Sequence, residues 1–580
     1  MSLVETDQFP GDIQYRDWGG RIAAEISDVL PILPAWALAD ALRRLPEEEL
    51  RLSLRSKIIP IVTLPGLRLF ATCGAPARAI ALRDGLRVVA EASAADFIAA
   101  SRAALGPRLL KEATFGLAAA RPVLSASRRL SKTQTTVIVL GVELILAASL
   151  LVPAELMWLV ASLVGGLFFL AIIALRILSL MPLPRQAPKA APSLADDELP
   201  DYTVLVPLFR ETSVLGQLLT ALTSLNYPED KLDIKLILEE SDILMQRAIA
   251  GLRLPPRFEV IVVPSGLPRT KPRALNYALQ YSRGELLTIF DAEDIPEPNQ
   301  LRLAAATFAS LPVDVACLQA QLLFYNPNEN WLARQFTIEY ASLFGLLLPA
   351  LAAYRLPLPL GGTSNHFRTE VLRRAGAWDP FNVTEDADLG LRLARLGYET
   401  ATIESRTYEE ANTKTLNWLR QRARWLKGFL QTWLVLMRSP MRFMGEVGPA
   451  GFWVAQAMTL GIFGSALLHP ICLAVMLLYF FLGPALPADA GLGTIIVAGL
   501  NLAVLVTGYM VTMIAGTRAL RLLGIRGWVF AIATMPVYWL LMSVAAWLAL
   551  WQFIVAPFHW NKTEHGLSNF QRRRKAKPRA

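Results

Sequence analysis

The stretch LLTIFDAED, residues 286–294, sets the fold that the sequence predicts. Its first five residues are apolar or β-branched, which is typical of a short buried strand. Three acids follow at once: Asp291, Glu293 and Asp294. Carboxylates grouped in the loop after a strand suit a hard divalent cation, which takes oxygen ligands and shares them with phosphates. A solvated acidic turn is the alternative for this loop when it is taken alone.

The residues around this stretch alternate between strand-like and helix-like patterns through about residue 440. Such alternation predicts an α/β fold with a mainly parallel sheet and helices on both faces. Ligands bind these sheets beyond the carboxyl ends of the strands, so the polar residues that follow each strand are candidate site residues. The expected strands are Thr203–Phe209, Ile234–Leu238, Val260–Val263 and Leu286–Phe290, and the expected helices are Glu211–Ser224 and Arg273–Ser282.

Apolar segments flank this α/β region on both sides. The chain has 580 residues, of which 54% are hydrophobic and 18% are charged, and this balance fits a protein that lies partly in lipid. Thr135–Val152 and Leu156–Leu175 are each about as long as a bilayer requires. Basic residues on both sides of this pair predict a hairpin whose two ends lie in the cytosol. Three more apolar runs follow the α/β region: Phe452–Leu482, Thr494–Ala515 and Trp528–Val555.

The last apolar runs raise a question of topology. The basic tail Gln571–Ala580 should lie in the cytosol, but three single crossings would leave it outside. Two alternatives would give the even number of crossings that leaves the tail in the cytosol. Either Phe452–Leu482 crosses twice and turns near His469-Pro470, or a later segment is re-entrant around Pro536.

The net charge of +9 does not indicate nucleic acid, because many of the basic residues flank apolar runs instead of forming one face. The three cysteines are far apart, with no metal-ligand spacing and no even disulfide set, which indicates a reducing, cytosolic environment. Residues 1–132 show no signal-peptide pattern and predict a small α/β domain. This domain resembles the amino-terminal domain of type II secretion ATPases, which implies docking or regulation; a packing module is the alternative. Its expected elements are the strands Ile58–Leu64 and Leu86–Val89 and the helix Ala94–Ala104.

Two further motifs lie downstream of the acidic loop. Thr384-Glu385-Asp386 opens an expected helix, Asp386–Leu396, where a carboxylate would act as general base for an acceptor hydroxyl. The alternative is an ordinary helix start with acids in the first turn. The run QRARW at residues 421–425 lies in the amphipathic stretch Thr415–Leu436, and helical spacing puts its Gln, second Arg and Trp on one face. The alternative is a helix at the membrane interface.

These three motifs, in this order, resemble those of the family 2 processive membrane glycosyltransferases, the group that contains cellulose, chitin and hyaluronan synthases. The resemblance covers roughly residues 200–440. It implies a GT-A fold, inversion at the anomeric carbon, and a UDP-sugar donor with Mg²⁺ or Mn²⁺. By this resemblance Asp291 and Glu293 hold the metal and the diphosphate. Glu293 replaces the usual second Asp, so Asp294 competes with it as the second ligand.

The resemblance also assigns the two downstream motifs. Asp386 matches the general base, with Glu385 beside it. Gln421, Arg424 and Trp425 match the motif that clamps the diphosphate and forms the acceptor entrance. Weaker correspondences assign the nucleotide sugar to Glu211, Glu239, Glu240 and Lys271, the acceptor to Gly362, Ser364 and His366, and a mobile gate over the nucleotide to Lys562, Thr563 and His565, with ordinary loop, cap or anchor roles as alternatives.

The sequence thus predicts an inverting glycosyltransferase that polymerises sugar from a UDP-sugar, UDP-glucose as first choice, into an exported β-linked polysaccharide. Its partners would be the donor, the growing glycan, the bilayer of a bacterial-type inner membrane and an accessory export protein, with catalysis in the cytosol. Two alternatives remain: transfer of one sugar to a lipid carrier, and a degenerate scaffold or transporter. The expected domains are 1–132 (amino-terminal), 133–181 (transmembrane hairpin), 182–200 (linker), 201–447 (GT-A domain with interfacial helix), 448–556 (transmembrane bundle) and 557–580 (tail with the gate).

Overall fold

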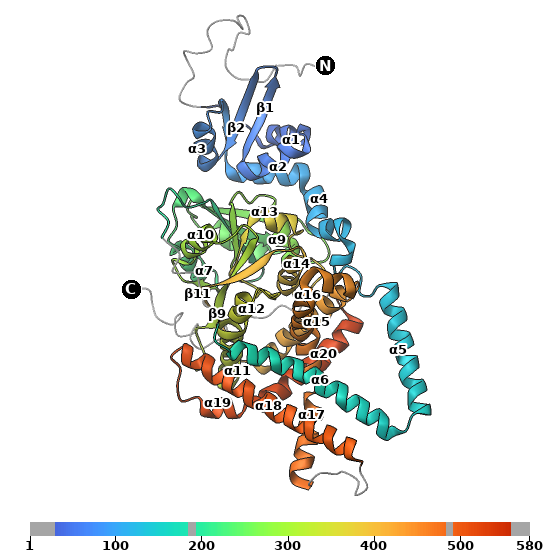
Figure 1. Ribbon diagram of the computed structural model, residues 1–580. Helices are drawn as coiled ribbons and strands as arrows, with labels where there is room; N and C mark the ends of the chain where they lie inside the picture. Colours follow the sequence, from blue (N-terminus) through green and yellow to red (C-terminus); the bar gives the residue numbers. More distant parts are fainter. Residues whose placement is uncertain (1–29, 184–192, 483–490, 558–580) are drawn as a thin grey trace, which may run out of the picture. The chain divides into compact units, whose positions relative to one another are not determined.

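A computed structural model describes residues 30–183, 193–482 and 491–557 of the chain (Figure 1). The chain divides into two compact units, one that ends at Ala104 and one that begins at Leu105. The long helix α4 (Ala94–Ala120) runs from the first unit into the second.

The first unit is a small α/β fold, as the sequence predicts. Its three strands pair in the order β1-β2-β3, antiparallel and then parallel. Strand β1 has the predicted bounds, whereas α4 continues well beyond the predicted Ala104. The elements are α1 (Ala35–Arg44), α2 (Glu47–Ser56), β1 (Ile58–Leu64), β2 (Leu67–Cys73), α3 (Ala75–Arg83) and β3 (Val88–Ala92).

The second unit is built on an eight-stranded, mainly parallel sheet in the order β6-β5-β4-β7-β10-β9-β11-β8. The four strands expected from the sequence form the parallel half, β6-β5-β4-β7. Strand β10 is antiparallel to both of its neighbours, and β11 returns parallel to β9. The strands are β4 (Tyr202–Leu208), β5 (Leu232–Glu239), β6 (Phe258–Val263), β7 (Leu286–Ile289), β8 (Ile295–Pro296), β9 (Val315–Phe324), β10 (Asn365–Arg368) and β11 (Glu399–Glu409).

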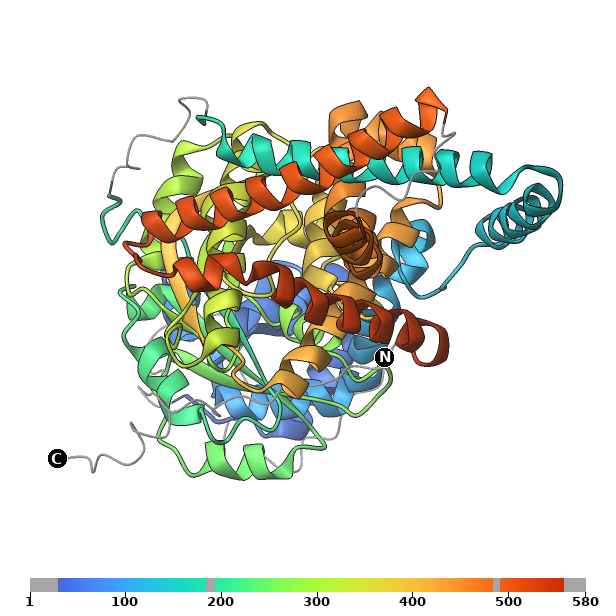
Figure 2. The same ribbon diagram turned by 90° about the horizontal axis from the view of Figure 1, so that it is seen from below.

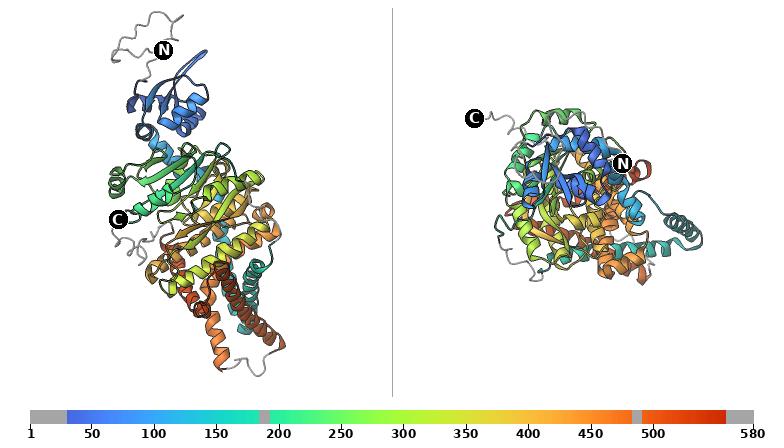
Figure 3. Two further views of the ribbon diagram at one scale, coloured as in Figure 1. Left: turned by 90° about the vertical axis from the view of Figure 1, so that its left-hand side faces the viewer. Right: turned by 90° about the horizontal axis from the view of Figure 1, so that it is seen from above.

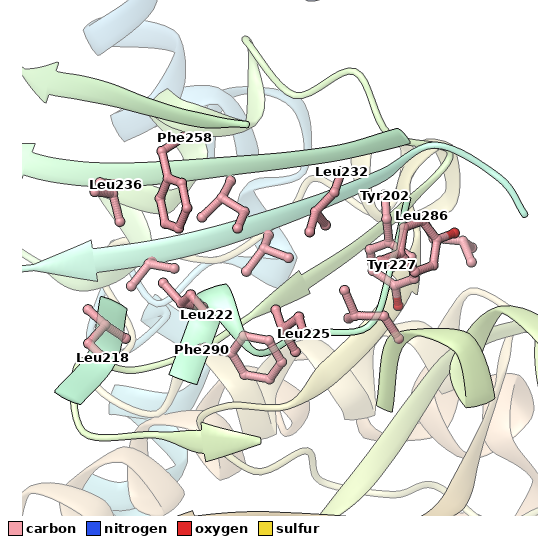
Figure 4. Packing of buried hydrophobic residues seen from close by; sticks show 14 of the residues in the cluster. Tyr202, Leu218, Leu222, Leu225, Tyr227, Leu232, Leu236, Phe258, Leu286 and Phe290 are labelled. Atoms are coloured by element: carbon pink, nitrogen blue, oxygen red, sulfur yellow. The ribbon is translucent and has the colours of Figure 1, made fainter. Parts of the chain in front are cut away.

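One face of the parallel half packs against α7 (Leu215–Thr223) and α10 (Gln300–Ser310). Leu218 and Leu222 of α7 lie in the same buried cluster as Leu236 of β5 (Figure 4). Each such side chain contributes roughly 1.5–3 kcal/mol when it is fully removed from water. This cluster fixes the strands whose carboxyl ends form the site.

The other helices of the α/β region are short. The predicted helix from Glu211 begins four residues late, at Leu215, because Arg210 has a φ of 56° and the chain turns before the helix starts. The remaining helices are α8 (Ile243–Ala250), α9 (Lys271–Leu279), α13 (Thr369–Arg374) and α14 (Glu385–Arg395).

Six described helical segments are long and apolar enough to cross a membrane, and they mark a membrane protein. They lie together on one side of the sheet (Figure 3). Helices α6 and α18 run side by side (Figure 2). The segments are α5 (Lys132–Leu151), α6 (Ala154–Leu180), α11 with α12 (Trp331–Ala353), α16 with α17 (Pro440–Val475), α18 (Leu492–Leu522) and α20 (Met535–Val555).

Helix α11 (Trp331–Ser342) was not expected from the sequence as an apolar segment of this kind. Its window is 56% buried, far more than that of α5 or α6. It lies against β9 and α18, so it joins the sheet to the apolar helices. Arg334 and Glu339 interrupt its apolar pattern, which is why the sequence alone did not reveal it.

The structure bears on the two topologies that the sequence left open. Helix α17 (Ile462–Leu482) runs unbroken through Pro470, so the chain does not turn at His469-Pro470. Around Pro536, by contrast, a short helix, α19 (Val529–Ala533), precedes α20. Helix α20 then packs along α15 (Thr415–Leu436).

Candidate active site

A cavity of about 1010 Å³ opens at the carboxyl ends of β4, β5 and β7. Most of the residues that the motifs predicted line this one cavity, although they come from loops and helices up to about 200 residues apart. The predicted residues in its lining are Glu211, Glu239, Lys271, Asp291, Glu293, Gly362, Glu385, Asp386, Gln421, Arg424 and Trp425.

Lys271 and Asp291 form the ionic centre of the cavity. The Lys271 Nζ lies 2.5 Å from the Asp291 Oδ1 and donates to the Gly362 carbonyl at 2.8 Å. Burial lowers the pKa of Lys271, but Asp291, followed by Glu385 and Asp386, outweighs burial and raises this pKa above its usual value. Lys271 therefore stays a cation in the midst of carboxylates. Lys271 is the first residue of α9, and Asp291 lies two residues beyond the end of β7.

Glu293 and Glu409 bring two further carboxyl groups next to Asp291. Burial, and then the Asp291 carboxylate, raise the pKa of Glu293 well above its usual value. Burial also raises the pKa of Glu409, with Asp294 and Glu293 as further causes. Glu409 lines the cavity from the end of β11, and the sequence reasoning missed it. An acid at the end of a strand would have been the signal, but β11 itself was not predicted.

Asp294 faces away from the cavity and holds the acidic loop in shape. One of its oxygens accepts from the Asp291 backbone N–H at 2.7 Å and from the Thr363 hydroxyl. Its other oxygen, Oδ1, has no hydrogen-bond partner among the described residues. Asp294 is fully buried and is absent from the cavity lining.

The loop of Glu385 and Asp386 lies opposite the acidic loop. Burial, and then the neighbouring Asp386, raise the pKa of Glu385 to about 8. Burial raises the pKa of Asp386 as well, while the Ala387 backbone N–H donates to its Oδ1 at 2.7 Å. A Cβ placed on Gly362 would lie 3.0 Å from the Asp386 Oδ2, so the glycine lets the loop backbone approach this carboxylate.

Helix α15 presents the QRARW motif to the same cavity. The Arg424 Nη1 donates to the Val383 carbonyl at 3.4 Å, and its guanidinium lies in the field of Glu385 and Asp386. The Gln421 Oε1 accepts from the Asn412 side chain at 3.0 Å. The motif therefore brings a cation next to the expected base.

Gly428 sets how closely α15 approaches this loop, and the sequence reasoning did not single it out. A Cβ at this position would lie 2.3 Å from the Thr384 Oγ1. No side chain fits there without a shift of the loop or the helix. A glycine one turn beyond Arg424 was the available signal.

Trp425 lies in an aromatic group that surrounds a buried ion pair. Its ring stacks on that of Tyr340, with centroids 6.2 Å apart. The Arg422 guanidinium lies 4.6 Å from the centre of the Trp425 ring and makes two 2.7 Å contacts to Glu339. Neither Arg422 nor Glu339 was predicted as a site residue. A charged residue within an apolar helix was the signal, because such a residue needs a partner.

Glu239 and Glu240, the two neighbouring acids expected to bind the nucleotide sugar, differ in their surroundings. Glu239 lines the cavity and pairs with Arg273 at 2.6 Å. Glu240 accepts from the Ser265 backbone N–H at 2.9 Å and is absent from the lining. Of the two, the structure brings Glu239 to the cavity.

Ser364 and His366, expected at the acceptor, lie in the core of the sheet. Both are fully buried, because β10 inserts between β7 and β9. The Ser364 hydroxyl bonds that of Thr407 at 2.6 Å, and the His366 Nδ1 lies 2.6 Å from the Tyr202 hydroxyl. Burial lowers the pKa of His366 to about 3. An acceptor in the cavity would not reach either side chain.

The expected gate residues Lys562, Thr563 and His565 lie outside the described residues. The last described residues, Ala556 and Pro557, lie against α15. The Lys427 Nζ lies 3.4 Å from the Ala556 carbonyl oxygen, and the Gln431 side chain donates to the Pro557 carbonyl at 2.9 Å. Within the described residues, no group of three or more His, Cys, Asp or Glu side chains is arranged to hold a metal ion by itself.

Comparisons with known proteins bear on the α/β domain that carries this cavity. Residues 200–428 match the family model described as "Glycosyltransferase like family 2". A probable glycosyltransferase of Bacillus subtilis is 25% identical over 234 residues, 40% of this chain and 56% of that protein. The β-monoglucosyldiacylglycerol synthase of Synechocystis is 24% identical over 315 residues, 52% of this chain and 62% of that protein. The cellulose synthase catalytic subunit of Pseudomonas fluorescens is 26% identical over 247 residues, 40% of this chain and 32% of that protein.

The matches thus span between about a third and about three fifths of the length of these relatives. Among solved structures, a mannosyltransferase of Pyrobaculum calidifontis in complex with GDP-Man and Mn²⁺ is 16% identical, with a TM-score of 0.41 over 69% of this chain and 98% of that one. The fold assignment rests on the sheet and on the family match instead.

The mainly parallel sheet, with its cavity at the strand ends, and the family match define a glycosyltransferase of the GT-A fold. Residues 200–428 are a glycosyltransferase domain of the family 2 type. Apolar helices on both sides of that domain mark the chain as a membrane protein.

Proposed function

We propose that this protein is an inverting glycosyltransferase that uses a UDP-sugar, UDP-glucose as first choice, and extends a β-linked polysaccharide. The observation that best supports this proposal is the meeting of Lys271, Asp291, Asp386 and Arg424 in one cavity beside apolar helices. A degenerate scaffold or transporter would have no need to keep two carboxylate loops and two cations together.

A divalent cation, Mg²⁺ or Mn²⁺, fits the donor set of the acidic loop. Asp291 and Glu293 line the cavity with their carboxyl oxygens, whereas Asp294 lies outside the lining, which favours Glu293 for the second position. Two carboxylates suffice when substrate phosphates supply the other oxygens, as is usual for Mg²⁺. The cation would neutralise charge that develops on the leaving diphosphate.

The protein's own residues would bind and orient the donor. The guanidinium of Arg424 and the ammonium of Lys271 face the carboxylate loops, where each would contact diphosphate oxygens. Glu211 and Glu239 line the cavity near the ends of β4 and β5, and would receive the nucleoside.

Asp386 would act as the general base in a single displacement. The Ala387 backbone N–H donates to the Asp386 Oδ1 and favours the ionised form of this carboxyl, which supports Asp386 in the role of base. The acceptor hydroxyl oxygen attacks the anomeric carbon, and its proton passes to the Asp386 carboxylate. The bond between the anomeric carbon and the diphosphate oxygen breaks, and its electron pair leaves with UDP.

We also propose that transfer is repeated on the same product chain and that the chain is exported. Trp425 lies between the base loop and the apolar helices, so a sugar stacked on its ring would be presented to Asp386 and then move towards the membrane. In this proposal the catalytic domain faces the cytosol of a bacterial-type inner membrane. An accessory export protein would receive the product, and nucleic acid would have no role.

A direct assay tests the proposal. The purified protein is incubated with each common UDP-sugar and Mg²⁺ or Mn²⁺, UDP release is followed, and the product is digested with linkage-specific hydrolases. We expect metal-dependent UDP release and a product cleaved by a β-specific hydrolase. Release of no UDP from any of these donors, by a protein that binds none of them, would refute the assignment.

A further inference from the structure

The first apolar helix, α5, carries a carboxylate near its middle. Glu143 is the twelfth of the 20 residues of α5, so at 1.5 Å per residue its Cα lies about 2 Å from the midpoint of the helix. From there each end of the helix is more than about 10 Å away, beyond the reach of a glutamate side chain. Ionisable side chains within membrane spans are costly in lipid and are almost always paired or turned towards a polar environment. Glu143 therefore needs a partner at this depth.

Glu143 lies on the side of α5 that faces away from the rest of the described chain. The partly covered residues of α5 are Gln134, Gly141 and Ala148, which recur every seven residues, or two helical turns, and so share one face. This face is the inner one, because the Gln134 side chain donates to the Leu434 carbonyl at 2.7 Å. Glu143 is exposed and lies two residues beyond Gly141, about 200° around the helix.

Among the described residues, none makes a hydrogen bond or an ion pair with Glu143. Helix α5 lies at the edge of the group of apolar helices (Figures 1 and 2), and 0% of its apolar window is buried. Four apolar side chains lie within two turns of Glu143 on the same side of the helix and are between 48% and 86% exposed: Val139, Leu140, Leu146 and Leu150. We call these four residues and Glu143 the outward face of α5.

A second copy of this chain does not supply a cation at the depth of Glu143. In the six described apolar segments, every Lys and Arg lies within five residues of an end of its segment: Lys132, Arg176, Arg334, Arg442, Arg518 and Arg521. Two copies that met through the outward face would bring two carboxylates together, and like charges at close range disfavour each other. A cation near the middle of a different transmembrane helix complements the outward face in both charge and depth.

We propose that the outward face of α5 binds a transmembrane helix of another protein, and that this helix carries a Lys or Arg near its middle. The cation of the partner pairs with Glu143, and apolar residues of the partner pack against Leu140 and Leu146 on either side of the pair. The inference does not rest on the proposed function, since no residue of the candidate active site takes part in it.

Three synthetic transmembrane peptides test the inference. Each is a helix of leucine and alanine, about 20 residues long, and the three differ only in a central Lys, Gln or Leu. Their binding to the full-length protein in phosphatidylcholine nanodiscs is measured by fluorescence energy transfer. The Lys peptide should bind at least about tenfold more tightly than the Leu peptide. Equal affinities for the three peptides, or a Gln peptide that binds as tightly as the Lys peptide, would overturn the inference.

Matched variants show whether the preference for the Lys peptide depends on Glu143. Glu143→Leu makes α5 more apolar, so the helix still inserts, and it should abolish the preference. Glu143→Asp keeps the carboxylate and should retain the preference. Glu155→Leu makes the same change in the first turn of α6, away from the middle of a span, and should also retain it. A preference for Lys that survives in Glu143→Leu would overturn the inference.

The oligomeric state of the protein distinguishes a partner helix from a second copy. Light scattering of the detergent-solubilised protein, without peptide, should give the same mass for the wild type and for Glu143→Leu. A wild-type dimer that becomes a monomer in Glu143→Leu would assign the outward face to a second copy and overturn the inference.

Discussion

A Cβ on Gly428 of α15 would lie 2.3 Å from the Thr384 Oγ1. The backbone of the helix that carries the QRARW motif therefore packs directly against the side chain that precedes Glu385 and Asp386. Arg424 lies one helical turn before Gly428, and Asp386 lies two residues after Thr384, so a shift at this contact would move the two charged residues relative to each other. Gly428→Ala should therefore push the two elements apart and lower kcat more than tenfold, as misplacement by about 1 Å does. UDP release by purified variants measures the effect.

Gly216→Ala is the control for this change. Gly216 also lies in a helix, α7, and a Cβ there would meet nothing within 4 Å. Alanine is the better helix former by about 1 kcal/mol, so this variant should keep its activity and its stability. Equal activity in the two variants would contradict the close contact at Gly428.

Asp386→Asn should lower kcat by about 10²–10⁴-fold, because the amide cannot accept the acceptor's proton. Binding of UDP should persist, since Lys271 and Arg424 remain in place. Isothermal titration with UDP and an assay of UDP release separate the two effects. Asp197→Asn, at an exposed position, should change neither; normal turnover in Asp386→Asn would remove this residue from the mechanism.

Arg424→Ala should weaken UDP binding and slow turnover, because a charge-assisted contact to the diphosphate is lost. A loss of about 2–3 kcal/mol, or roughly 30- to 150-fold in Kd, is expected for a buried contact of this kind. Arg420→Ala removes an exposed arginine from the same helix and serves as the control. Unchanged affinity for UDP in Arg424→Ala would argue against a clamp.

Because the folded protein raises the pKa of Glu385, the free energy of unfolding should fall as pH rises. Its pKa is about 8 in the folded protein against an ordinary value of 4.5, so between these values the folded state holds a proton that the unfolded chain has released. Stability therefore falls through this window, by a few kcal/mol at most. Glu385→Gln does not titrate, and its Tm should fall less than that of the wild type between about pH 5 and pH 8.5. Parallel Tm curves would contradict the raised pKa.

The pair of Glu339 and Arg422 should behave as a unit. Arg422→Met leaves the Glu339 carboxylate without its cation and should lower the Tm by several degrees. Adding Glu339→Gln should recover part of that loss, because the stranded charge is gone. Arg442→Met breaks an exposed pair with Glu446 and should change the Tm little. Strictly additive Tm changes in the double variant would show that the two residues do not interact.

The parallel half of the sheet was predictable because its strands are short apolar runs bounded by polar turns. Strand β5, for example, is buried at every position, as a central parallel strand should be. The cavity residues next to these strands, Asp291 and Glu239, followed from their positions at strand ends. Local pattern was sufficient for them because each lies at the end of its own strand.

The other half of the sheet was not predictable in this way. Strand β10 has only four residues, too few to show an alternation, so Ser364 and His366 were interpreted as part of a polar loop. Their burial depends on pairing with β7 and β9, which are distant in sequence. Glu409 was missed for the same reason, since β11 finds its place by pairing with β9.

Helix α20 lies along α15, supplies Met542 to the cavity wall and is followed by two carbonyls that Lys427 and Gln431 bind. Helix α20 therefore forms part of the wall of the cavity. A chimaera that grafts this sheet onto the membrane helices of another enzyme must take α15 and α20 together as one cassette. A soluble fragment cut at residue 447 would lack one of the pocket's walls.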